Sequence, residues 1–121
     1  MVSAQLTPLE SAVLDKLLEK HDEPFDAIRE QLAHASVSDR KFTGVGFFTH
    51  FAVPQDAPVR RDLASAELGH VGAKISGLAD GAGFILFIRD GVVSFLEGYT
   101  YGDAAWPDHI TDFSVFATQT I

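Results

Sequence analysis

The sequence predicts a single α+β domain in which two N-terminal helices pack on a mostly antiparallel sheet of about 4–6 strands. Apolar residues recur at helical spacing before residue 35 and alternate along the chain after it. An Asp90-Gly91 pair separates two apolar runs, and this dipeptide is typical of a tight β-hairpin turn. The length of 121 residues and the hydrophobic content of 46% suit one domain, which we take as residues 1–121.

The first helix has clear start signals. Thr7 can cap it, Pro8 suits its first position and Glu10 completes a capping box. We expect this helix to end near Lys20-His21. A second helix is expected to start at Pro24. The apolar stripes are Leu9, Val13, Leu14, Leu17 and Leu18 in the first helix, and Phe25, Ile28 and Leu32 in the second.

Strands are expected at residues 37–42, 44–53, 67–75 and 110–117, in addition to the two strands of the Asp90-Gly91 hairpin. In the segment 44–53, Phe47 and Thr49 share one face while Phe48 and His50 share the other. The two prolines of residues 54–61 indicate a loop. Three glycines in residues 76–83 indicate a turn or short loop.

A two-residue turn at Asp90-Gly91 implies a register for the hairpin. It pairs Arg89 with Val92, Ile88 with Val93, Leu86 with Phe95 and Phe84 with Glu97. The register leaves both faces of the hairpin largely apolar, whereas a two-layer monomer exposes one face of its sheet to water. Either the long loops cover the second face or another subunit does, and we expect a homodimer.

Charge and composition exclude several classes of function. The net charge is −8, and residues 90–121 contain five acids and no Lys or Arg. This argues against a nucleic-acid partner, because phosphate binding needs a cationic surface, and it suits a basic protein partner. The chain has no cysteine, which excludes disulfides and Cys-based zinc sites. It shows no signal peptide and no apolar stretch of membrane-spanning length, so we expect a cytoplasmic protein.

Three residues are candidates for chemistry. The predicted register places Glu97 beside Phe84 on an apolar face, where a carboxylate would be desolvated and its pKa raised, as in a general acid or base. His50 and His70 could join it in a two-histidine, one-carboxylate site. No spacing motif supports a metal site, and no cofactor-binding or nucleophile motif occurs. We therefore expect no metal and no cofactor.

Residues 99–108 concentrate both tyrosines, the only tryptophan and two aspartates. Tyr99, Tyr101, Asp103 and Trp106 are candidates for binding a ligand or partner, because Tyr and Trp supply much of the energy at protein interfaces. The alternative is that this segment folds back and its aromatic rings cover the sheet.

Three stretches of sequence resemble a group of small bacterial proteins of unknown function. They are Thr43-Gly44-Val45-Gly46-Phe47-Phe48-Thr49, Gly83-Phe84-Ile85-Leu86-Phe87-Ile88-Arg89-Asp90-Gly91 and Ser94-Phe95-Leu96-Glu97-Gly98-Tyr99-Thr100-Tyr101-Gly102. The resemblance covers roughly residues 40–107. It implies a bacterial, cytoplasmic α+β protein and carries no activity or catalytic residue with it.

Two functions remain open. The first, which we favour, is a non-catalytic protein-binding module with an acidic, aromatic surface, like immunity or antitoxin proteins by compositional analogy. The second is a small-ligand-binding protein or enzyme with a pocket lined by His50, His70, Glu97 and Tyr99. A concave pocket that holds Glu97 and a histidine would favour the second function, and a flat or dimer-filled sheet face would favour the first.

Overall fold

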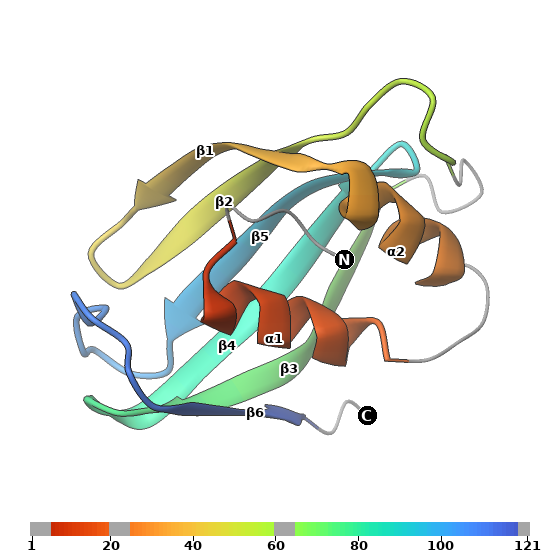
Figure 1. Cartoon of the computed structure of the whole chain (residues 1–121). Coiled ribbons are helices and arrows are strands. Elements are labelled where there is room, and N and C mark those ends of the chain that lie inside the picture. The colour runs from red at the N-terminus through yellow and green to blue at the C-terminus, as the bar shows by residue number, and fades with distance from the viewer. Residues whose placement is uncertain (1–5, 20–24, 60–64, 119–121) are drawn as a thin grey trace.

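The computed structural model describes residues 6–19, 25–59 and 65–118, and within them it contains two helices and six strands (Figure 1). The helices are α1 (Pro8–Leu17) and α2 (Phe25–His34), and the strands are β1 (Ser36–Phe42), β2 (Gly46–Ala52), β3 (Ala66–Ile75), β4 (Leu78–Arg89), β5 (Val92–Thr100) and β6 (Phe113–Ala117). All neighbouring strands pair antiparallel, in the order β1-β2-β5-β4-β3-β6. The predicted α+β class, N-terminal helices and antiparallel sheet are confirmed.

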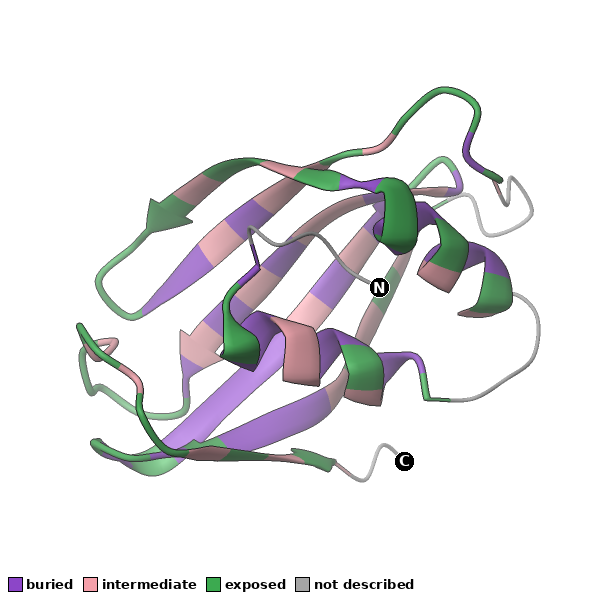
Figure 2. Ribbon diagram, viewed as in Figure 1, coloured by how far each residue is buried: buried purple, intermediate pink, exposed green. Residues whose placement is uncertain are grey.

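Both helices lie on the same face of the sheet (Figure 1). Buried leucine, valine and isoleucine side chains of α1 and α2 form one cluster with buried residues of the strands, among them Val71, Phe84 and Leu96. In Figure 2 the helix surfaces turned toward the sheet are buried and those turned away are exposed or half-buried. The core therefore occupies the space between the helices and one face of the sheet.

Helix α1 begins with the predicted capping box. The Thr7 hydroxyl accepts from the Glu10 amide at 3.1 Å, and the Glu10 carboxylate accepts from the Thr7 amide at 2.9 Å. The helix ends at Leu17, earlier than the predicted end near Lys20-His21, which lies outside the described residues. Pro24, the predicted start of the second helix, also lies outside them, and α2 is described from Phe25.

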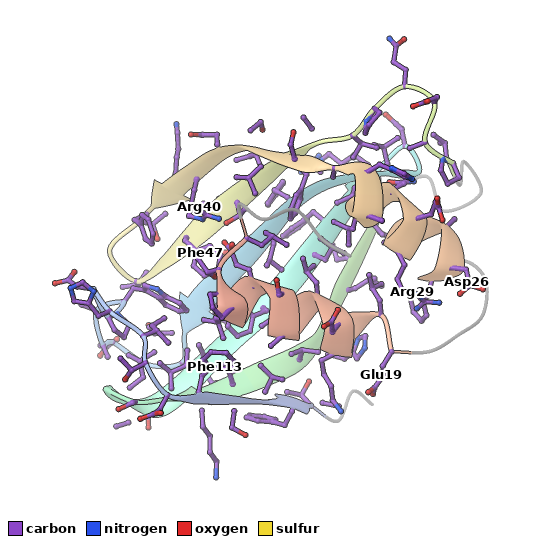
Figure 3. The ribbon with its side chains drawn as sticks, in the orientation of Figure 1. Glu19, Asp26, Arg29, Arg40, Phe47 and Phe113 are labelled. Carbon is purple, nitrogen blue, oxygen red and sulfur yellow. The ribbon has the colours of Figure 1, made fainter. Side chains whose placement is uncertain are left out.

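The Glu10 carboxylate also connects α1 to the sheet. Its side chain is only 2% exposed. It accepts two hydrogen bonds from the Arg40 guanidinium on β1, at 2.7 and 3.0 Å, and one from the Thr49 hydroxyl on β2, at 2.5 Å. Figure 3 shows Arg40 between β1 and the start of α1. A buried carboxylate is tolerated when charge and hydrogen bonds compensate its lost hydration, so this contact determines where α1 starts on the sheet.

Gln31 connects α2 to the turn of the hairpin. This fully buried amide donates to the carbonyls of Pro58 and Gly91, at 2.7 and 2.8 Å, and accepts from the Val93 amide at 2.8 Å. Arg29 of α2 also donates to the Leu18 carbonyl at the end of α1. These polar contacts satisfy backbone groups that burial would otherwise leave unpaired.

The predicted turn or short loop at residues 76–83 is confirmed only at its start, and the rest of that segment is a strand. A tight turn at Ser76-Gly77 leads directly into β4, which starts at Leu78. Gly77 has a φ of +97°, which suits a turn, but Gly83 lies inside the strand. A Cβ at Gly83 would lie 2.7 Å from the Tyr99 ring. This glycine therefore makes room for an aromatic ring and does not mark a loop.

The hairpin at Asp90-Gly91 is confirmed. Both turn residues have positive φ, at +53° and +79°, as this turn type requires. Arg89 pairs with Val92 and Ile88 with Val93, as predicted.

Beyond those two pairs the predicted hairpin register is wrong. Phe87 pairs with Phe95, Leu86 with Leu96 and Phe84 with Gly98, so Ser94 is an extra residue in β5, a β-bulge. The bulge lets Val93 and Leu96 both enter the core. It also places Gly98 at the position expected for Glu97, where a Cβ would lie 2.4 Å from the Phe47 ring. The space beside Phe84 is already filled by Phe47.

We expect Arg40→Met to destabilise the protein by about 2 kcal/mol, because it leaves the buried Glu10 carboxylate without its cation. Urea denaturation monitored by circular dichroism measures the change. Lys16→Met is the matched control, because Lys16 pairs with Glu19 at the surface, where an ion pair contributes less than about 1 kcal/mol. Equal losses in the two variants would contradict the structural role of Arg40.

We expect Gln31→Leu to cost about 3 kcal/mol, since the change leaves the Gly91 carbonyl and the Val93 amide buried without partners. The same denaturation experiment applies, with Glu30→Gln as the control because Glu30 is exposed and pairs with His34 on the same helix. A loss below about 0.5 kcal/mol for Gln31→Leu would mean that the Gln31 hydrogen bonds do not help to hold α2 on the sheet.

Candidate functional site

The sheet face turned away from the helices, here called the open face, carries a row of aromatic side chains. The register places the following residues on it: Phe48 and His50 of β2, Phe95, Glu97 and Tyr99 of β5, and Ile85, Phe87 and Arg89 of β4. Seven of these eight side chains are half-buried, and Arg89 is exposed. By contrast, the alternate residues of the same strands that face the helices, such as Phe84, Leu86 and Leu96, are fully buried.

Phe48, His50, Phe87 and Phe95, here called the phenylalanine cluster, pack against one another on this face. The Phe87 and Phe95 rings stack with centroids 4.3 Å apart and an interplanar angle of 20°. Phe48 meets Phe95 edge to face at 5.7 Å, and the His50 ring lies 5.2 Å from it. The Arg89 guanidinium lies 5.7 Å from the Phe95 ring centroid, in the range of a cation–π contact.

A second aromatic group lies over glycines at the β6 side of the open face. Tyr99 and Tyr101 meet edge to face with ring centroids 5.8 Å apart. A Cβ on Gly83 would lie within 2.8 Å of both tyrosine rings or hydroxyls, and one on Gly72 would lie 3.1 Å from Phe116. The missing side chains therefore let these rings lie close to the backbone. Burial raises the pKa of the Tyr101 hydroxyl, and Tyr99 raises it further.

The tertiary structure separates the binding residues predicted at 99–108. Tyr99 and Tyr101 belong to the open face, but Trp106 packs on the helix side, edge to face with Phe47 at 5.1 Å and with Phe84 at 6.4 Å. Trp106 is half-buried against the core, which agrees with the alternative that this part of the segment folds back onto the sheet. Asp103 is exposed in the connection between β5 and β6.

Glu97 lies on the open face and not beside Phe84 as predicted. It pairs with Phe48 on one side and with Ile85 on the other, so apolar residues flank it on both neighbouring strands. Desolvation raises the pKa of this carboxyl, and the Glu67 carboxylate on β3 raises it further. The predicted rise in pKa is thus present, on the opposite face of the sheet from the one predicted.

The ionisation of Glu97 has a consequence for stability. The folded protein holds this proton more tightly than the unfolded chain does, so ionisation costs stability as the pH rises from the ordinary pKa of a glutamate through the raised pKa of the folded state.

The structure brings together two of the three candidate residues for chemistry. His50 pairs with Phe95, and Phe48 pairs with Glu97, so His50 and Glu97 are diagonal neighbours on the open face. His70 lies on β3, which β4 separates from β5, at an irregularity where its carbonyl accepts from the Thr118 amide. Among the described residues, no group of three or more His, Asp or Glu side chains could hold a metal ion.

Hollows occur elsewhere on the molecule. One of about 280 Å³ lies at the hairpin end of the open face and includes Glu67, Phe87 and Arg89 in its lining. Another of about 250 Å³ lies beside the start of α1 and is lined mainly by apolar groups such as Phe47 and Trp106. A third, of about 700 Å³, is bounded by β3, β4 and β6. Glu97, His50, His70 and Tyr99, which were predicted to line one pocket, line none of these three.

Comparison with protein-family models, with curated proteins and with solved structures finds no match to this chain. The resemblance to small bacterial proteins therefore stays a prediction. No helix in the described part of the chain is long and apolar enough to span a membrane.

The phenylalanine cluster was not predicted from the sequence as a unit. Phe48 and His50 were correctly placed together, but the predicted pairing of Leu86 with Phe95 put Phe95 on the face opposite Phe87. The available signal was that Val93 and Leu96 are both strongly apolar at an odd spacing, which one face can accommodate only with a bulge.

We expect Glu67→Gln to lower the pKa of Glu97 without returning it to the ordinary value, because desolvation is the larger cause and persists. Titration of the side-chain carboxyl carbons by NMR measures this pKa. Glu30→Gln on α2 is the control and should leave it unchanged. A Glu97 pKa that does not move in Glu67→Gln would show that the two carboxylates are not coupled.

Proposed function

We propose that this protein is a non-catalytic protein-binding module and that the open face of its sheet is the binding surface. The observation that carries this proposal is the phenylalanine cluster, in which stacked aromatic rings are half-buried and not fully buried, on a face that no described helix covers. Large exposed apolar patches on soluble proteins mark interaction sites. Aromatic residues and arginine supply most hot spots at such sites, and both are present here.

The rigidity of the cluster supports binding. Its rings project from the paired strands β2, β5 and β4 and already pack against one another, so they lose less side-chain freedom than isolated surface rings when a partner packs against them. Ordering a mobile side chain at an interface costs about 0.5–1.5 kcal/mol. A preformed aromatic surface avoids much of that cost.

The sheet edges are poorer binding surfaces than the face. Edge strand β1 presents three consecutive charged residues, Asp39, Arg40 and Lys41, and the other edge, β6, is only five residues long. Charged and short edge strands are the usual means by which proteins prevent pairing with another strand. We therefore place the partner on the face and not at an edge.

A ligand site around Glu97 is the second candidate function. The raised pKa of Glu97 and its position diagonal to His50 support it, since a carboxyl and an imidazole on one face could share a proton with a bound small molecule. This second candidate function places a small-molecule site on the open face. The protein would then be a ligand-binding protein or an enzyme.

We propose a cytoplasmic, bacterial protein. The charge of −8 suits solubility and could attract a basic protein toward surfaces other than the open face. The likeness to immunity and antitoxin proteins is one of size and charge alone.

Site-specific photocrosslinking tests the proposed surface. A photoreactive phenylalanine analogue replaces Phe87 or Phe48 on the open face or, as the control, Phe42, which is 66% exposed and pairs with the core residue Phe47. We expect protein crosslinks from the two open-face positions in cells and few from position 42. Equal or absent crosslinking at all three positions would contradict the proposal, and tight binding of a metabolite with no protein crosslink would support the ligand site instead.

A further inference from the structure

We infer that the open face binds a second copy of this chain, so that the protein is a homodimer with its two sheets packed face to face. The inference rests on the proposed function, because it uses the same surface, and it adds the identity of the partner.

The charges of the open face are balanced, unlike those of the whole chain. At the paired strand positions of this face there are three acids, Asp39, Glu67 and Glu97, and three bases, Lys41, Lys74 and Arg89. The chain as a whole carries a net charge of −8. Two copies therefore repel each other on most of their surface. On this face the paired positions carry no net charge, so contact there brings no net repulsion.

Balanced charge also discriminates between partners. A strongly basic partner would be drawn to the acidic surfaces of the chain and would gain little from a face with as many bases as acids. A two-fold contact, in contrast, brings together two copies of a face with mixed charges, so that bases of one copy can meet acids of the other. Isologous contacts of this kind are the commonest in homo-oligomers.

The phenylalanine cluster occupies a suitable position for a symmetric contact. It spans β2, β5 and β4, three successive strands of the six. A two-fold axis passing near Phe95 would bring the two clusters into contact, and hot spots gather at the centre of an interface and pair with those of the partner. Arg89 lies over the Phe95 ring, so Arg89 of the partner subunit would be available to the Glu97 carboxylate near this centre.

The size of the face matches what a stable dimer needs. Strands of five to 12 residues, six of them side by side, outline a face whose flat projection is roughly 800 Å² when strands lie about 4.8 Å apart and rise about 3.3 Å per residue. The accessible surface of the side chains on this face is larger than the projection. A standard-size interface takes about 800 Å² from each partner. Two sheets that pack face to face also bury apolar side chains about 10 Å apart, as in a β-sandwich.

Sedimentation equilibrium of the purified full chain, from about 1 to 100 μM, tests the inference. We expect the wild-type protein to sediment at twice the chain mass of 13.1 kDa. Phe95→Ser should raise the dimer dissociation constant at least about tenfold, because it removes the ring at the centre of the cluster. Phe42→Ser is the matched control, an exposed phenylalanine on the other side of the sheet, and should leave dimerisation unchanged.

A second variant keeps the test informative if Phe95→Ser does not fold. Arg89 is exposed, so Arg89→Glu should fold normally, as circular dichroism can verify, and should weaken the dimer by placing acids of the two copies together. A wild-type chain that stays at 13.1 kDa up to about 100 μM, or a dimer that neither Phe95→Ser nor Arg89→Glu weakens, would overturn the inference.

The two proposals can fail separately. If the wild-type chain is monomeric while crosslinks from positions 87 and 48 join it to a different polypeptide, the open face is a binding surface and the second-copy inference is wrong. If the dimer persists in both variants and the open-face positions give no crosslink, both proposals are wrong.

Discussion

The β-bulge at Ser94 is the constraint on which the arrangement of the open face depends. Without the extra residue, Val93 and Leu96 could not both enter the core, and the side chain of residue 97 would have to occupy the space that Phe47 fills beside Gly98. The bulge reverses the facing of β5 from Phe95 onward. As a result, Phe95 joins Phe87 and Phe48, and Glu97 lies among apolar neighbours on the far side from the helices. One residue therefore determines both the aromatic cluster and the environment of the perturbed carboxyl.

The other layer is held by buried polar side chains at its two ends. Glu10 links α1 to β1 and β2 through Arg40 and Thr49, and Gln31 links α2 to the hairpin turn. Each satisfies groups that would otherwise be buried unpaired, so sliding a helix along the sheet would leave a charge or an amide without its partner. Hydrophobic contacts alone would specify position less sharply. Because these contacts hold both helices on one face, the opposite face is left to the aromatic side chains.

The same face concentrates the features that suggest function. It carries stacked rings, a cation over one of them, a carboxyl of raised pKa and, at its paired strand positions, equal numbers of acids and bases. A protein-binding surface and a self-association surface are chemically alike at this level, and both need a rigid apolar centre with a polar rim. The balance of charge within an otherwise acidic chain is the feature that favours a second copy.

The sequence by itself determined the local elements of this protein. The capping box at Thr7, the alternation in β2 and the positive-φ turn at Asp90-Gly91 each depend on a few neighbouring residues, and each is present in the structure. The tertiary structure decided the bulge in β5, the strand that contains Gly83, the separation of Trp106 from Tyr99, and the partners of Glu10, which lie 30 and 39 residues away. These features depend on contacts between residues that are far apart in the sequence. No local sequence pattern indicates that such residues lie close together. The sequence singled out Glu97 as a candidate but placed it on the wrong face of the sheet. The reason is that a one-residue shift in register moves a side chain to the other face.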